Sequence, residues 1–204
     1  MRIAYLTQSY PPSVSGAAIV ARQLAEGIAR RGHQVLVIAA SDRGAPYLKQ
    51  TDNLSELHLR SAPNPFRVGQ CFMLPGRRQV LRALGEFQPD LIHTHDAFQL
   101  GLTGAAHARR RGIPTVLSIH ALPGLATSYI PDLDGLRGRV ECLLWTYAHW
   151  LLKKFDTITT PTRAIANIVA ERTGISPRTV SNGIDLRAFT SSTRTTVIPC
   201  WASK

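Results

Sequence analysis

The chain has 204 residues, of which 44% are hydrophobic and 18% charged, an ordinary globular composition that supplies one sizeable domain and does not comfortably allow two. Its formal net charge is +11, from 24 Lys and Arg against 13 Asp and Glu, and such an excess favours anionic partners such as phosphates, nucleic acid or acidic lipid headgroups. No apolar run approaches the ~20 residues that a membrane span requires, so any membrane contact is expected to be peripheral.

The amino terminus and the cysteines indicate a cytoplasmic protein. The first predicted strand begins at Arg2, without the apolar stretch and cleavage site of a secretory signal. Cys71, Cys142 and Cys200 are widely spaced and form neither a metal-ligand pattern nor a disulfide framework, which fits a reducing compartment. We therefore expect the protein in the cytoplasm, with peripheral contact at the inner face of the membrane as an alternative.

Apolar strands alternate with amphipathic helices along most of the chain. In the first predicted helix, Val20, Leu24 and Ile28 recur four residues apart, as on one face of a helix. Strands are expected over 3–6, 35–39, 115–119 and 156–160, a further strand begins within 89–93, and helices are expected over 17–31, 101–111, 136–155 and 164–172. This repeated order of strand, helix and strand predicts an α/β fold, a doubly wound and mostly parallel sheet with helices on both faces.

Two features of the remaining sequence are less regular. The segment 41–75 contains several prolines and polar patches, so we expect loops around a single strand near 56–60. Trp145 and Trp150 both lie in the predicted helix 136–155, and we expect core or interdomain packing from them rather than a binding site.

A short basic amphipathic helix is predicted after Pro75. Its apolar residues are Val80, Leu81 and Leu84, its basic residues are Arg77, Arg78 and Arg82, and a second basic cluster occupies 109–111. Such a helix either lies on anionic lipid or packs its apolar side on the sheet as an ordinary helix. Nucleic-acid binding is suggested by charge alone and is not expected, because interleaved aromatic residues and a recognisable module are missing.

In a doubly wound sheet the ligand site lies outside the carboxyl ends of the strands. Ser15 and Gly16 follow the first predicted strand and open the first helix, where backbone N–H groups and the positive helix end suit an anion such as a diphosphate. The alternative for this segment is a plain helix cap by Ser15. Because the loop lacks the G-x-G-x-x-G arrangement, a dinucleotide cofactor is not expected.

Histidines follow two further predicted strands. His93, His95 and Asp96 lie at the end of the strand that begins within 89–93, and His120 follows the strand 115–119. A histidine at such a place can hydrogen-bond a sugar hydroxyl or a phosphate and can exchange protons near neutral pH. A metal site is disfavoured, because nothing supplies a clear further ligand.

Taken together, these segments resemble family-four glycosyltransferases, retaining enzymes with the GT-B fold of two facing doubly wound domains. The last matching segment, 182–189, begins with Asn182 and Gly183, a pair that by itself would indicate only a turn. The matching segments, in family order over about nine tenths of the chain, are 11–16, 31–35, 89–95, 112–120, 156–162 and 182–189.

The resemblance implies a function and roles for particular residues. The enzyme would transfer a sugar from a nucleotide diphosphate sugar to a hydroxyl acceptor, without an added cofactor or an obligatory metal. Gly16 would lie against the donor diphosphate, with Ser15 where the family often has a second glycine. His120 would act as the catalytic contact to the transferred sugar or the reacting phosphate. His95 and Asn182 would contribute to donor or acceptor binding, Asn182 at the passage into the second domain.

The resemblance also predicts the domain organisation. Residues 1–189 correspond to the Rossmann-like, acceptor-side amino-terminal domain, and 190–204 form a tail that continues none of the pattern and is expected to be disordered. The carboxyl-terminal donor-binding domain, with its basic pair and its paired glutamates, has no counterpart in this sequence. We therefore expect a truncated, inactive form. The alternatives are one subunit of a split enzyme, completed by a separate chain, and a catalytically dead module that binds an acceptor or a partner protein.

Overall fold

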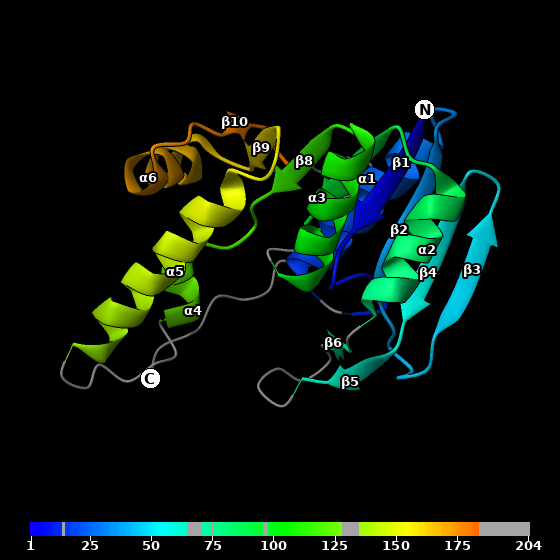
Figure 1. The fold of residues 1–204 in the computed structure, drawn as a ribbon, viewed down its shortest axis with the longest axis horizontal. Helices are drawn as coiled ribbons and strands as arrows, with labels where there is room; N and C mark the ends of the chain where they lie inside the picture. Colours follow the sequence, from blue (N-terminus) through cyan, green and yellow to red (C-terminus); the bar gives the residue numbers. More distant parts are fainter. Residues whose placement is uncertain (14, 65–70, 75, 96–97, 128–134, 184–204) are drawn as a thin grey trace, which may run out of the picture.

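The structure, a computed structural model, describes residues 1–13, 15–64, 71–74, 76–95, 98–127 and 135–183 (Figure 1). Its main sheet has eight strands in the order β10-β9-β8-β7-β1-β2-β4-β3. The strands are β1 (Arg2–Leu6), β2 (Gln34–Ala40), β3 (Tyr47–Thr51), β4 (Leu54–Leu59), β7 (Leu91–Thr94), β8 (Thr115–Ser118), β9 (Thr157–Thr160) and β10 (Arg178–Thr179). All neighbours pair in parallel except β3 with β4, so the predicted α/β class is confirmed.

Helices cover both faces of this sheet (Figure 1). They are α1 (Gly16–Ala29), α2 (Arg77–Phe87), α3 (Gln99–Arg111), α4 (Pro123–Thr127), α5 (Leu136–Leu152) and α6 (Arg163–Thr173). On one face, α1 packs through alanines such as Ala21 and Ala25 against Val37 of β2. On the other face, α2 and α3 pack against alternate residues of the same strands, which include Leu6 and Ile38. The residues that alternate along β1 and β2 are thus buried on both sides, as expected for parallel strands.

The basic helix after Pro75 packs as an ordinary helix. This helix is α2, in which Val80 and Leu84 are buried in the core while Arg77 and Arg78 are exposed. The apolar side is therefore already covered by the sheet and by α3. No helix among the described residues is both long and apolar enough to cross a bilayer.

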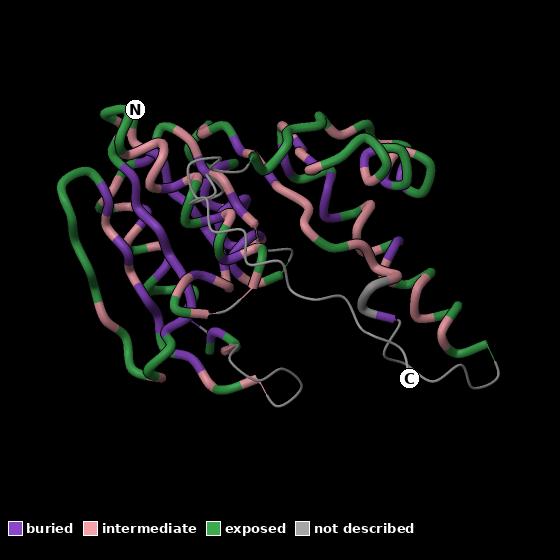
Figure 2. The backbone as a smooth tube through the Cα atoms, turned by 180° about the vertical axis from the view of Figure 1, so that it is seen from behind, coloured by how far each residue is buried: buried purple, intermediate pink, exposed green. Residues whose placement is uncertain are grey.

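The segment 41–75 contains more regular structure than the sequence predicts. The expected strand near 56–60 is confirmed as β4, but β3 and the small antiparallel pair β5 (Ser61–Pro63) and β6 (Cys71–Met73) were not expected. β3 is an edge strand whose residues are mostly exposed (Figure 2), so it carries no apolar alternation that could reveal it. β5 and β6 are too short for any periodicity.

The two tryptophans of α5 have different surroundings. Trp145 is 9% exposed and joins the core between α5, α6 and β9, whereas Trp150 is 48% exposed, with the Lys154 ammonium 3.9 Å from its ring centroid. Core packing is thus confirmed for Trp145, whereas Trp150 does not pack in this core, and interdomain packing stays a prediction for it. Five residues along a helix correspond to a rotation of about 140°, so the two rings cannot face the same side. The predicted tail at 190–204 and Cys200 lie outside the described residues.

Candidate functional site

The loop between β1 and α1 is held by hydrogen bonds at three points. The Thr7 hydroxyl donates to the carbonyl oxygen of Ser9 at 2.9 Å, and the hydroxyl of the buried Tyr10 donates to Oε1 of Glu56 on β4 at 3.1 Å. At the end of the loop, Oγ of Ser15 accepts a hydrogen bond from the backbone N–H of Ala18 at 3.1 Å and caps α1. The capping role of Ser15 is thus confirmed.

Gly16 lies at a point where the fold itself does not require glycine. Its φ is outside the left-handed region, and a Cβ added there would meet no atom of the described residues within 4 Å. Gly16 is exposed on the first turn of a 14-residue helix, whose free N–H groups and positive end favour an anion. The space beside Gly16 is therefore open to a ligand, and a side chain there would narrow that space.

His95 and His120 meet at the carboxyl ends of β7 and β8. The backbone N–H of His95 donates to the carbonyl oxygen of Leu6 at 2.8 Å, which extends the pairing of β7 with β1 by one residue. Nδ1 of His95 and Nε2 of His120 lie 2.6 Å apart in a hydrogen bond, and the two rings stack with centroids 4.7 Å apart. The expectation that these two histidines share one edge of the sheet is confirmed.

A second row of polar side chains lies beneath this pair. Nε2 of His93 is hydrogen-bonded to Oγ of Ser118 at 2.7 Å, and Ser118 is hydrogen-bonded to Oγ1 of Thr159 at 2.8 Å, so that one chain crosses β7, β8 and β9. The buried ring of Tyr5 on β1 contacts His93 of β7 and His95, which follows that strand, with centroids 4.6 Å from His93 and 5.2 Å from His95. The imidazole of His95 is therefore enclosed by rings from β1, β7 and the segment after β8.

Burial keeps these histidines neutral. It lowers the pKa of His93 to about 4, with a smaller contribution from His120, and it lowers the pKa of His95 well below its usual value, with contributions from His93 and His120. Burial also lowers the pKa of His120. At neutral pH the imidazoles therefore carry no charge and take part in their hydrogen bonds as neutral groups. The pKa of the Tyr5 phenol is raised by burial, so this group stays protonated.

Not every predicted site residue joins this arrangement. Asn182 is exposed in the segment after β10, and β9 separates β10 from β8, so two strand spacings of about 5 Å each intervene. No contact joins Asn182 to the described histidines. Asp96 lies outside the described residues. Among the residues that are described, no three His, Cys, Asp or Glu are grouped so as to hold a metal ion.

Three supporting side chains were missed by the sequence reasoning. Tyr5, Ser118 and Thr159 each lie within a strand, whereas most of the predicted site residues follow strands. A polar residue inside an otherwise apolar strand is the signal that could have found Ser118 and Tyr5. The hydrogen bond between Ser118 of β8 and Thr159 of β9 depends on which strands are neighbours in the sheet, and a single sequence does not show this.

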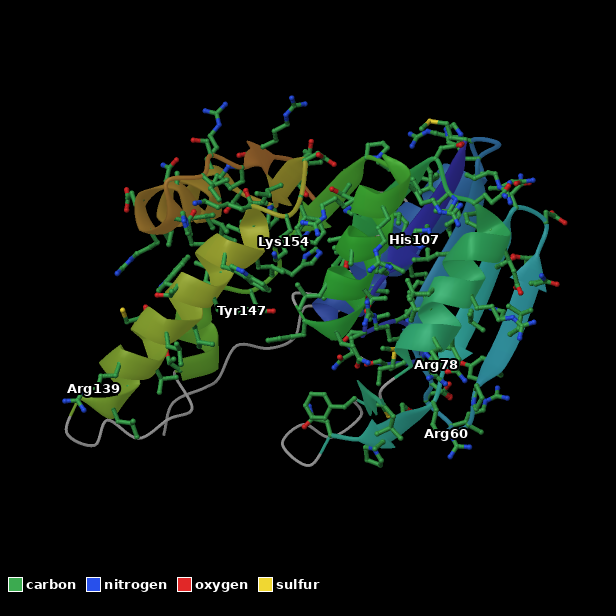
Figure 3. All side chains as sticks on the ribbon, viewed as in Figure 1. Arg60, Arg78, His107, Arg139, Tyr147 and Lys154 are labelled. Carbon is green, nitrogen blue, oxygen red and sulfur yellow. The ribbon has the colours of Figure 1, made fainter. Side chains whose placement is uncertain are left out.

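A cavity of about 1080 Å³ lies elsewhere, between α3 and the carboxyl-terminal end of α5, and none of the predicted site residues lines it. Its wall includes Trp150, Lys154 and Arg109. In Figure 3, Tyr147 lies on α5, Lys154 lies just past the carboxyl-terminal end of that helix, and Arg78 lies on α2. We base the candidate site on the strand ends and not on this cavity, because the convergent polar groups with shifted pKa values lie at the strand ends.

Comparison with known proteins identifies relatives of the chain. The family model described as Glycosyltransferase Family 4 matches residues 14–188. A GDP-mannose-dependent alpha-mannosyltransferase of Mycobacterium tuberculosis is 30% identical over 208 residues, covering 97% of this chain and 51% of the relative. An alpha-monoglucosyldiacylglycerol synthase of Streptococcus pneumoniae is 26% identical over 191 residues, covering 93% of this chain and 42% of the relative. The chain thus spans about half the length of the curated relatives it matches.

Solved structures of other proteins share the fold of this chain. A sucrose-phosphate synthase of Thermosynechococcus elongatus matches 92% of this chain with a TM-score of 0.61 at 15% identity, and the match covers 49% of that protein. A glycosyltransferase of Rickettsia africae matches 96% of this chain with a TM-score of 0.61 at 13% identity, and covers 46% of that protein. At these identities the likeness concerns the fold alone.

Proposed function

The chain belongs to glycosyltransferase family 4, and we propose on this premise that the protein transfers a sugar from a nucleotide diphosphate sugar to a hydroxyl group of an acceptor. The observation that carries the proposal is the family match over 14–188 together with the position of its site residues. The open space at Gly16 and the neutral pair His95 and His120 follow β1, β7 and β8, whose carboxyl ends lie at one edge of the sheet.

We further propose that the transfer retains the configuration of the sugar. The relatives are named for alpha-linked products, an alpha-mannosyltransferase that depends on GDP-mannose and an alpha-monoglucosyldiacylglycerol synthase. Nucleotide-activated mannose and glucose carry their sugar in the α configuration, so an α-linked product means retention. Both names are also consistent with a hydroxyl acceptor, which is the acceptor class that we propose for this protein.

The groups of this chain would act on the donor by hydrogen bonding and through the helix end. The open first turn of α1 at Gly16 would hold the diphosphate, because free N–H groups and the positive helix end stabilise negative charge. His120 would contact the transferred sugar or the reacting phosphate, with His95 behind it. Ser15 already caps α1, and we propose that its side chain borders the ligand. Asn182 would act separately, at the passage to a donor-binding domain. This scheme uses no added cofactor or metal.

We also propose that the protein works in the cytoplasm, in peripheral contact with anionic lipid. Exposed arginines support this proposal, namely Arg78 on α2 and Arg109 and Arg110 at the end of α3. The apolar side of α2 is buried in the core, so the contact would be electrostatic and without insertion of that helix. Sedimentation with phosphatidylglycerol vesicles at low and high salt tests it. Binding that is equally strong with neutral phosphatidylcholine vesicles would contradict it.

Calorimetric titration of the purified chain with GDP, UDP, GDP-mannose and UDP-glucose tests the main proposal. We expect binding of at least one diphosphate, and we expect Gly16→Val to weaken it by about tenfold or more, since the side chain would occupy the open space. Gly85→Val on α2 is the matched control, because a Cβ added there also meets no atom within 4 Å. A folded chain that binds none of the four compounds would contradict a donor site in this half of the enzyme.

A further inference from the structure

We propose that His95 is a positioning residue that donates a hydrogen bond from Nδ1 to Nε2 of His120, and thereby fixes the proton of His120 on Nδ1. His120 then presents an N–H donor, not a bare nitrogen, to a ligand at the carboxyl edge of the sheet. The identity of that ligand, a sugar hydroxyl or a phosphate oxygen, rests on the proposed function. The tautomer of His120 is independent of the proposed function.

The distance between the two rings requires a single shared proton. Nδ1 of His95 and Nε2 of His120 are 2.6 Å apart, and the lowered pKa values of both residues make the rings neutral at pH 7. A neutral imidazole has one N–H and one bare nitrogen, so either His95 donates and His120 accepts, or the reverse. In each alternative the accepting ring carries its proton on its second nitrogen, whereas the second nitrogen of the donating ring is bare.

The surroundings of His95 decide between the two alternatives. Nε2 of His95 is buried and has no hydrogen-bond partner among the described residues. If His120 donated, His95 would carry its proton on this nitrogen, as a buried N–H without an acceptor. If His95 donates, the buried Nε2 is a bare acceptor. Proteins tolerate an unsatisfied buried acceptor more readily than an orphaned buried N–H, so the second arrangement is favoured.

The packing around His95 holds its ring in the orientation that this requires. The rings of Tyr5 and His93 lie 5.2 Å and 4.7 Å from the His95 ring, and the His120 ring stacks 4.7 Å away. His93 is itself held by the Ser118 hydroxyl at 2.7 Å. The groups that face His95 from β1, from β7 and from the segment after β8 are thus a protonated phenol and two neutral imidazoles. None of them is a charged group that would draw the proton away.

The consequence for ligand binding is a matter of donors and acceptors. Nδ1 of His120 has no hydrogen-bond partner among the described residues, so its proton is available. A phosphate oxygen can only accept, and a bare nitrogen facing it would place two lone pairs together. A protonated Nδ1 would instead donate to a phosphate or sugar oxygen without the desolvation cost of a charged imidazolium.

The test is nuclear magnetic resonance of the ¹⁵N-labelled chain, with long-range spectra that distinguish protonated from bare imidazole nitrogens. At pH 7.5 we expect His120 to show a bare Nε2 and a protonated Nδ1. His95→Asn retains an N–H near the position of Nδ1 and should preserve this tautomer, whereas His95→Leu should move His120 toward the Nε2-protonated form. His107 on α3 serves as an internal control whose signals should not change.

Two outcomes would overturn the proposal. One is a proton on Nε2 of His120 in the unmodified chain, and the other is an unchanged His120 tautomer in a folded His95→Leu variant. Where the same variants are titrated with the nucleotide sugar that binds, we expect His95→Leu to weaken binding about tenfold and His95→Asn to recover most of it. If no nucleotide binds, the proposed function fails while the tautomer result stands, so the two failures are distinguishable.

Discussion

Replacing Gly104 with alanine should destabilise the protein, although alanine is the better helix former. Gly104 is buried in the middle of α3, where the helix crosses the sheet. A Cβ at this position would overlap Cδ1 of Leu6 and come within 3.3 Å of Cγ2 of Ile92. Both neighbours are fully buried, so neither can move aside into solvent. The absence of a side chain at Gly104 therefore sets how closely α3 approaches β1 and β7.

The expected magnitude follows from two opposing effects. Forcing one methyl group into a packed core costs about 1–3 kcal/mol, and the complete burial of Leu6 and Ile92 places Gly104→Ala near the upper end. The higher helix propensity of alanine than of glycine stabilises the variant by about 1 kcal/mol. The net loss should thus be about 2 kcal/mol. The control is Gly85→Ala in α2, where an added Cβ meets no atom within 4 Å and where only the gain of up to about 1 kcal/mol should remain.

Urea denaturation followed by circular dichroism measures both variants under the same conditions. A loss of about 2 kcal/mol lowers the midpoint by roughly 1 M urea for a protein of this size, while Gly85→Ala should raise it slightly. The packing of α3 on the sheet would be refuted if Gly104→Ala were as stable as Gly85→Ala. A changed denaturant slope would instead indicate an altered unfolded state, and the comparison would then be made by thermal unfolding.

Three further predictions concern the stability of the fold. The pKa of His93 is about 4 in the folded chain against 6.5 for a free histidine, so between these pH values the unfolded chain binds a proton that the folded chain does not. The free energy of unfolding should therefore fall by up to roughly 3 kcal/mol as the pH drops from about 6.5 to 4. His93→Gln should make this pH dependence weaker, as measured by urea titrations at several pH values. Ser15→Ala should cost about 1 kcal/mol through loss of the cap on α1, and Ser15→Gly only a few tenths, as measured by thermal unfolding. Asp156→Asn should lower the free energy of unfolding by about 1 kcal/mol in the same assay, because Oδ2 of Asp156 accepts hydrogen bonds from the backbone N–H and the hydroxyl of Thr115 at 2.8 and 2.7 Å. An unchanged melting temperature would contradict a role of Asp156 in joining β8 to β9.

The sequence was sufficient to predict that His95 and His120 each lie at the carboxyl edge of the sheet, and the topology of parallel sheets then brings them together. Both residues follow buried strands, and strands that are consecutive in such a fold are usually neighbours with their carboxyl ends at one edge. The contact of Tyr5 with the same histidines could not be predicted. β1 pairs with β7 although β2 to β6 lie between them in the chain, and no local sequence pattern indicates this pairing.

Local patterns also explain what was missed at the two edges of the sheet. β3 is exposed and polar, so its pairing with β4 is the main reason that it is a strand, and pairing is not a property of one segment. Asn182 follows β10, a two-residue strand at the opposite edge, and the resemblance alone could not say how far it would lie from His120. The central strands, with their continuous apolar runs, were predictable because burial on both faces determines their composition.

The distribution of charge links the fold to the proposed chemistry. The net charge is +11, yet Ser15, Gly16, His95 and His120 carry no formal charge at neutral pH, so the positive charge lies elsewhere on the surface. A diphosphate at α1 would thus be held by N–H donors and the helix end, at short range and without counterion release. Lipid contact through exposed arginines would be screened over about 8–10 Å at physiological salt. Raising the salt concentration should therefore release the protein from anionic vesicles while changing nucleotide affinity much less, and this difference would separate the two surfaces in a single preparation.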